Sequence, residues 1–112
     1  STLAYQGYGH GLDLEALRSM LAFATDNLKP DLTVYLDIDV EAGLQRKRRV
    51  DEWNRLDAYE ISFHQRVRDG YHQLMAQEPG RWVMVDAALP KDEVQSQIRQ
   101  VVLAKLGRDL KA

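Results

Sequence analysis

The chain has 112 residues, enough for one domain or a large part of one. Hydrophobic residues make up 45% of it and charged residues 29%, a balance typical of globular chains that excludes the disordered and fibrous classes. A net charge of −2 indicates no bulk attraction to nucleic acid. No apolar run reaches the ~20 residues of a membrane-spanning helix. We therefore expect no nucleic-acid or membrane partner, and the absence of Cys suits the cytoplasm.

The first 30 residues predict a loop followed by one helix. Residues 1–12 contain three glycines, which favours a loop or a loose first turn. Asp13 is suited to cap the amino end of a helix. Apolar side chains then recur at steps of three and four residues across 14–28, which places them on one helical face until Pro30 stops the helix.

The remaining sequence alternates strands with helices. Two nearly continuous apolar runs, 32–38 and 81–86, predict parallel strands buried on both faces. Helices are predicted from about Asp39 to the basic stretch, from about 57 to 77 with Phe63, Val67, Tyr71 and Leu74 as its apolar stripe, and from about Pro90 to Gly107. This order favours an α/β layer with two parallel strands and about four helices. Because so few strands form a thin core, we expect a partner segment upstream.

The opening segment offers groups that can read a base. Ser1 and Thr2 carry hydroxyl groups and Gln6 an amide, and all three can hydrogen-bond the edge of a base. The ring of Tyr5 can lie against a sugar or base. The alternative is an ordinary polar chain terminus.

A second candidate site is the basic stretch that contains Arg46, Arg49 and Arg55, with Lys47 and Arg48 between them. Guanidinium groups stay ionised and form forked hydrogen bonds to phosphate, and phosphoryl transfer requires positive charge over the phosphate oxygens. A solvated helix face is the alternative interpretation.

A third candidate is the turn formed by Asp86, Ala87 and Ala88 after the second strand. Ligands of open α/β sheets bind at the carboxyl ends of the strands, so this turn is placed for a nucleotide contact. A plain strand-to-helix turn is the alternative. No His or carboxylate spacing predicts a metal site.

Two motifs carry a resemblance to a known family. Ala4-Tyr5-Gln6-Gly7 and the strand Asp31-Leu32-Thr33-Val34-Tyr35-Leu36-Asp37, followed by the arginine-rich stretch, resemble the carboxyl-terminal half of thymidylate kinase. The resemblance implies a P-loop nucleoside monophosphate kinase type three-layer fold. It divides the chain, as part of one domain, into a dTMP-pocket loop (1–12), a lid (46–57) and an adenine-side loop (85–90). The chain has no Gly-x-x-x-x-Gly-Lys-Ser/Thr phosphate loop, so we expect an inactive fragment of a longer kinase.

The resemblance also implies a role for each residue of the dTMP pocket. Ser1 and Thr2 would approach the thymine ring. Tyr5 would sit beside the deoxyribose and disfavour a 2′-hydroxyl, while Gln6 would support the pocket wall. This interpretation makes the opening segment the binding site for dTMP.

On the ATP side, the resemblance assigns Arg46 to the adenine face. Arg55 would reach the phosphates with Arg49 as a helper, which makes these two the catalytic candidates. The backbone of Asp86, Ala87 and Ala88 would border the adenine.

The implied reaction is transfer of the ATP γ-phosphoryl group to dTMP. Mg2+ would be bound mainly by the phosphates and the absent amino-terminal half, and the parent protein would be a homodimer. Two alternatives stay open: another P-loop nucleoside or nucleotide kinase, or a degenerate module that only makes protein contacts.

Overall fold

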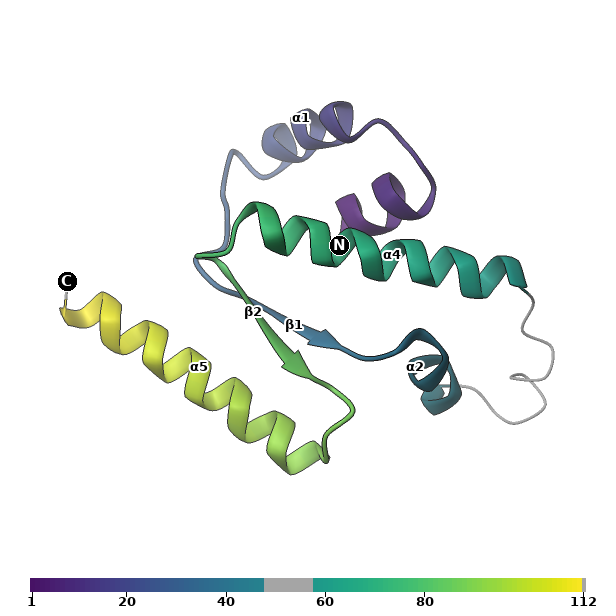
Figure 1. Ribbon diagram of the computed structural model, residues 1–112. Coiled ribbons are helices and arrows are strands. Elements are labelled where there is room, and N and C mark those ends of the chain that lie inside the picture. Colours follow the sequence, from purple (N-terminus) through teal and green to yellow (C-terminus); the bar gives the residue numbers. More distant parts are fainter. Residues whose placement is uncertain (48–57, 112) are drawn as a thin grey trace. The chain divides into compact units, whose positions relative to one another are not determined.

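The structure, a computed structural model, describes residues 1–47 and 58–111 (Figure 1). These residues form two parallel strands and five helices, so the predicted mixed α/β fold is confirmed. The chain divides into two compact units. The first comprises Ser1–Lys29 and Asp39–Gln77, and the second comprises Pro30–Ile38 and Glu78–Ala112.

The first unit opens with η1 (Leu3–Gly9), a π-helix. The prediction of a loop or a loose first turn over residues 1–12 was therefore wrong for 3–9, and the described residues contain this helix in addition to the predicted number of about four. The N–H of His10 donates to the carbonyl of Tyr5 at 3.0 Å, the wide spacing of a π-helix. Two of the glycines that suggested a loop are needed for packing: a Cβ atom on Gly7 would clash with the Leu14 side chain, and one on Gly9 would lie 2.7 Å from the Phe63 ring.

Helix α1 (Leu14–Ala24) follows, capped as predicted by Asp13. Oδ1 of Asp13 accepts hydrogen bonds from the N–H groups of Glu15 at 2.9 Å and Ala16 at 3.4 Å. The helix ends at Ala24, well before the predicted stop at Pro30. Asp26 and Asn27 take left-handed φ values of 54° and 60°, a conformation that Asp and Asn tolerate and that ends a helix.

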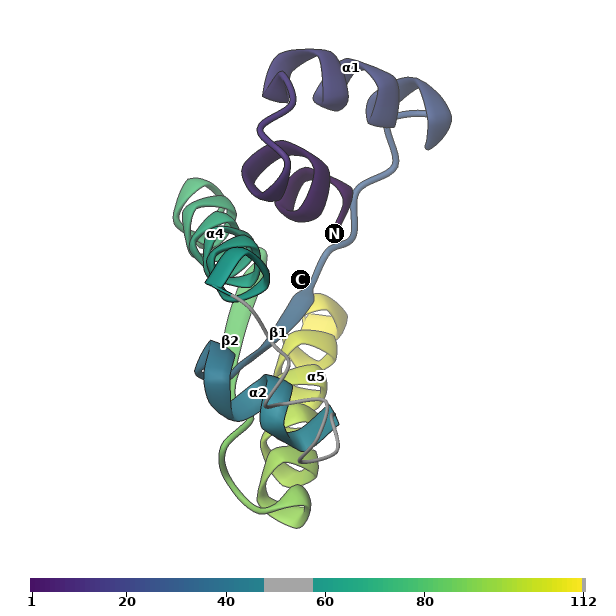
Figure 2. The same ribbon diagram turned by 90° about the vertical axis from the view of Figure 1, so that its right-hand side faces the viewer.

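Helices α2 (Val40–Lys47) and α4 (Ala58–Gln77) complete the first unit. Asp39 precedes α2, and its carboxylate accepts a hydrogen bond from the N–H of Ala42 at 3.4 Å, which caps the amino end of the helix. A guanidinium nitrogen of Arg68 on α4 lies 4.0 Å from the other Asp39 carboxylate oxygen. Helix η1 lies along α4 in both ribbon views (Figures 1 and 2). Because α4 contacts both η1 and α2, it is the central element of this unit.

The second unit contains β1 (Thr33–Asp37), β2 (Trp82–Asp86) and α5 (Lys91–Lys111). The strands are parallel, with Thr33 opposite Trp82 and Asp37 opposite Asp86. Helix α5 packs on β2, whose Val85 is 2% exposed. The prediction that both strands are buried on both faces was wrong, because Leu36 is 47% exposed and Met84 is 51% exposed.

Arg81 joins the amino ends of the two strands. Its carbonyl accepts a hydrogen bond from the N–H of Thr33 at 2.8 Å, and its guanidinium donates to Thr33 Oγ1 at 2.8 Å. The same guanidinium lies 5.0 Å from the centre of the Trp82 ring, a cation–π geometry. These contacts fix the register at one end of the strand pair.

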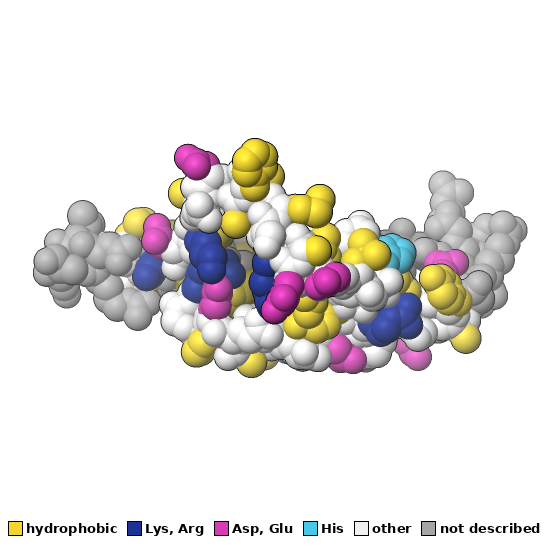
Figure 3. Space-filling model, turned by 90° about the horizontal axis from the view of Figure 1, so that it is seen from above, with side chains coloured by type: hydrophobic (Ala, Val, Ile, Leu, Met, Phe, Trp, Pro, Cys, Tyr) yellow, Lys and Arg dark blue, Asp and Glu magenta, His cyan; other side chains and the backbone are white. Residues whose placement is uncertain are grey.

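The surface mixes charged and apolar side chains (Figure 3). Phe23 on α1 is 91% exposed and Met20 is 67% exposed. In the part of the chain that the structure describes, no helix combines the length and the hydropathy that crossing a membrane requires.

Candidate nucleotide site

Helix η1 brings the four predicted dTMP-binding residues together. Tyr5 and Gln6 lie within it, Thr2 occupies its amino cap, and Ser1 precedes the cap. The side chains of all four are exposed, whereas Ala4, Gly7 and Gly9 of the same helix are buried. The predicted nucleotide-reading groups therefore share the exposed side of a short helix whose other side is packed.

Ser1 is tied to the unit by two hydrogen bonds. Its carbonyl accepts from the N–H of Tyr5 at 3.0 Å, and its Oγ accepts from the hydroxyl of Tyr71 at 3.0 Å. Tyr71 lies on α4, 70 positions along the chain from Ser1. Sequence analysis places Tyr71 in the apolar stripe of its helix. Nothing in the neighbouring sequence indicates that its hydroxyl contacts Ser1.

The ring of Tyr5 packs within an aromatic cluster on α4. Its centroid lies 6.2 Å from that of Phe63 in a tilted arrangement and 6.4 Å from that of Tyr71 at an interplanar angle of 84°. The ring of His10 lies 4.7 Å from that of Phe63. Such pairs are favourable and hold the rings in place. Tyr5 is still 40% exposed, so these contacts leave part of the residue accessible.

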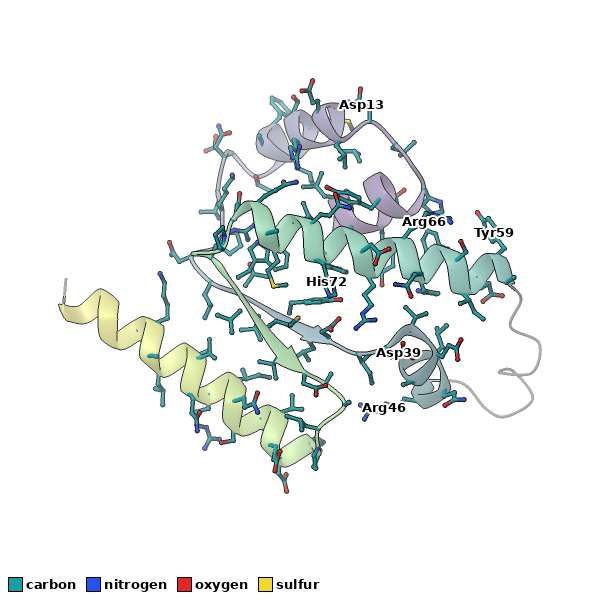
Figure 4. The ribbon with its side chains drawn as sticks, in the orientation of Figure 1. Asp13, Asp39, Arg46, Tyr59, Arg66 and His72 are labelled. Carbon is teal, nitrogen blue, oxygen red and sulfur yellow. The ribbon has the colours of Figure 1, made fainter. Side chains whose placement is uncertain are left out.

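The carboxyl end of η1 is held by Arg66, which sequence analysis also missed. Its Nε donates to the carbonyl of Gly9 at 3.1 Å, and a second guanidinium nitrogen donates to Ser62 Oγ at 2.8 Å. Figure 4 shows Arg66 on the side of α4 that faces η1. The backbone of α4 also lies close to η1 at Gly70, where a Cβ atom would lie 2.6 Å from the Tyr8 side chain. Helix α4 thus binds η1 near both of its ends.

The arginines predicted to contact ATP are only partly described. Arg46 is exposed on α2, where Figure 4 labels it. Arg49 and Arg55, like most of the predicted lid over 46–57, lie outside the described residues. Helix α2, which precedes the undescribed residues, begins directly after Asp39, and the Asp39 carboxylate pairs with Arg68 of α4.

The predicted adenine-side turn belongs to the second unit. Oδ1 of Asp86 accepts a hydrogen bond from the N–H of Ala88 at 2.9 Å, and the N–H of Ala87 donates to the carbonyl of Asp37 at 2.8 Å. The two alanine N–H groups are therefore already engaged. A ligand contact from these alanines would have to use their carbonyl groups or methyl side chains.

In residues 1–47 and 58–111, no three His, Cys, Asp or Glu side chains are grouped so that they could hold a metal ion. The exposed hydroxyl, amide and ring groups at η1 are of the kinds that can hydrogen-bond a base and contact a sugar.

Comparison with known proteins identifies the family. The family model described as thymidylate kinase matches residues 1–98. A thymidylate kinase of Roseiflexus castenholzii is 50% identical to this chain over an alignment of 115 residues. The alignment covers 91% of this chain and 50% of that protein. One from Dehalococcoides mccartyi is 46% identical over an alignment of 107 residues that covers 96% of this chain and 51% of that protein. One from Trichodesmium erythraeum is 45% identical over 106 residues, covering 95% of this chain and 47% of that protein.

The chain therefore spans about half the length of the curated relatives it matches. The match extends from the residues of η1 through both strands and into the first part of α5. The fold of this family is that of the P-loop nucleoside monophosphate kinases, in agreement with the mixed α/β arrangement. The chain belongs to the thymidylate kinase family.

Proposed function

We propose that the protein containing this chain transfers the γ-phosphoryl group of ATP to dTMP. The bond between the γ-phosphorus and the oxygen bridging to the β-phosphate breaks, and a bond to a 5′-phosphate oxygen of dTMP forms, which yields ADP and dTDP. The observation that carries this proposal is the family match over residues 1–98, together with relatives named thymidylate kinase at 45% to 50% identity.

In this proposal, the 112 residues form the carboxyl-terminal part of one kinase domain. Residues 1–12 contribute to the dTMP pocket, 46–57 form the lid and 85–90 border the adenine. Because the relatives are about twice as long, the segment that corresponds to their other half would supply the phosphate cradle. The chain on its own would then be inactive.

The dTMP side would depend on η1. Ser1 and Thr2 would hydrogen-bond the thymine, Tyr5 would contact the deoxyribose, and Gln6 would support the pocket wall. The structure supports this assignment because these side chains are exposed on one short helix and Tyr5 is held by aromatic contacts. A held ring can orient a nucleoside with little loss of side-chain freedom on binding.

On the ATP side, Arg46 would lie on the adenine, and Arg49 and Arg55 would contact the transferring phosphoryl group. Guanidinium groups can stabilise the charge on its oxygens without changing their own protonation. The turn at Asp86, Ala87 and Ala88 would border the adenine through its carbonyls and methyl groups. Mg2+, bound through the nucleotide phosphates, supplies further charge neutralisation in this chemistry.

Two further parts of the proposal follow from family membership. We propose that the parent protein is a homodimer, and that it acts in the cytoplasm on small-molecule nucleotides. Analytical ultracentrifugation of the full-length protein tests the first part, because a sedimentation coefficient of one protomer at working concentration would contradict it.

The test of the proposed function is a comparison of phosphoryl acceptors. The full-length protein is incubated with ATP and Mg2+ and with dTMP, dUMP, dCMP or dGMP in turn, and ADP release is measured. We expect dTMP to be phosphorylated with the highest kcat/KM. Equal rates with all four acceptors would indicate a different P-loop nucleotide kinase, and no ADP release with any of them would favour a non-catalytic module.

A further inference from the structure

The hydrogen bond between Tyr71 and Ser1 has a preferred direction. The two hydroxyl oxygens are 3.0 Å apart, so one hydroxyl donates to the other. A phenol is a stronger donor than an aliphatic alcohol, because its ring delocalises the charge left on oxygen. A hydroxyl that accepts one hydrogen bond is polarised, so that it becomes a better donor and a poorer acceptor of a second. Ser1 is thereby biased to donate.

Tyr71 also restrains the neighbourhood of Ser1. It is half-buried on α4, whereas Ser1 is exposed. Its ring meets that of Tyr5 edge-on, with centroids 6.4 Å apart, and the N–H of Tyr5 donates to the Ser1 carbonyl. One side chain of α4 therefore touches Ser1 and Tyr5, two of the three residues that the proposed function assigns to the nucleoside.

We propose that Tyr71 is a positioning residue that presents the Ser1 hydroxyl as a hydrogen-bond donor to the pyrimidine base. This inference rests on the proposed function and adds a basis for base selectivity. Thymine and uracil carry a carbonyl acceptor at C4, where cytosine carries an amino donor. A donor facing an amino group leaves two polar groups without partners, which lowers affinity for the wrong base.

The test compares variants of the full-length protein that contains this chain. Tyr71→Phe removes the hydroxyl and keeps the ring that contacts Tyr5. Ser1→Ala removes the acceptor, and the double variant reports whether the two groups act together. Tyr59→Phe is the matched control, because Tyr59 lies on the same helix and is 68% exposed (Figure 4).

We expect Tyr71→Phe to lower kcat/KM for dTMP and dUMP about threefold to tenfold, the effect of one net hydrogen bond. The value for dCMP should stay the same or rise, and KM for ATP should not change. Ser1→Ala should show the same loss, and adding Tyr71→Phe to it should cause no further loss. Tyr59→Phe should match the wild type, and all variants should share its Tm within a few degrees.

Each alternative outcome has a distinct meaning. If the wild type is active but Tyr71→Phe keeps the wild-type ratio of dTMP to dCMP turnover, the inference about Tyr71 is wrong and the proposed function stands. The inference is also wrong if the losses of the two single variants add in the double variant, or if Tyr71→Phe lowers Tm while all acceptors are affected equally. If the wild type phosphorylates no pyrimidine nucleotide, the proposed function fails and the inference fails with it.

Discussion

At the scale of single residues, the closest approach between η1 and α4 depends on glycine. A Cβ atom on Gly70 would lie 2.6 Å from the Cβ and Cγ atoms of Tyr8, a distance that requires one element to shift. The pair of helices that carries Tyr5 and Tyr71 therefore has no space for even a methyl group at this position.

We predict that Gly70→Ala lowers the free energy of unfolding of the full-length protein by about 1–3 kcal/mol, because overpacking outweighs the better helix propensity of Ala. Urea titration measures the change. Gly107→Ala on α5 is the control, since nothing lies within 4 Å of a Cβ atom there, and it should keep or raise stability. Equal stability of the two variants would contradict the packing argument.

At the scale of elements, the carboxylate of Asp86 contributes to the turn between β2 and α5. Oδ1 of Asp86 accepts the hydrogen bond from the N–H of Ala88. We predict that Asp86→Ala destabilises the protein by about 1 kcal/mol, because it removes this acceptor. Asp86→Asn should restore most of the loss, since an amide oxygen can accept the same bond.

Thermal unfolding of the two Asp86 variants tests this turn, and KM for ATP tests its proposed place beside the adenine. We expect KM for ATP to rise in Asp86→Ala while KM for dTMP stays at the wild-type value. A rise in KM for dTMP of the same size would contradict the assignment of this turn to the ATP side.

The elements that sequence analysis predicted are those with a clear period or run. The apolar stripe predicted α4 and the run 81–86 predicted β2, both within about two residues of their observed ends. η1 was missed because its glycines resemble those of a loop, whereas their role is to admit Leu14 and Phe63 from other helices. No reading of local sequence reveals such tertiary contacts.

The residues of the candidate site were likewise predicted only in part. The Ala-Tyr-Gln-Gly motif led to Ser1, Thr2, Tyr5 and Gln6, and the structure places these residues in η1 or directly before it. Tyr71 and Arg66 were missed, because their partners Ser1 and Gly9 are 70 and 57 positions away in the sequence. Whether these residues bind nucleotide remains a prediction, and so do the roles of Arg46, Arg49 and Arg55.

At the scale of the whole molecule, the proposed function requires the lid to supply positive charge for phosphoryl transfer. We predict that Arg55→Lys lowers kcat by roughly 10³-fold, because a compact ammonium cannot reproduce the forked contact of a guanidinium with phosphate oxygens. KM for dTMP should change little. Arg99→Lys, an exposed change on α5, is the control. A kcat within twofold of the wild type in Arg55→Lys would contradict the catalytic role of Arg55.

The central claim is that the protein containing this chain is a dTMP kinase. Its most direct measurement uses the full-length protein, ATP labelled at the γ-phosphate, Mg2+ and dTMP, with chromatographic separation of the products. The proposal predicts that the label appears in dTDP in step with ADP formation. Label that stays in ATP, or that is released only as inorganic phosphate, would contradict it.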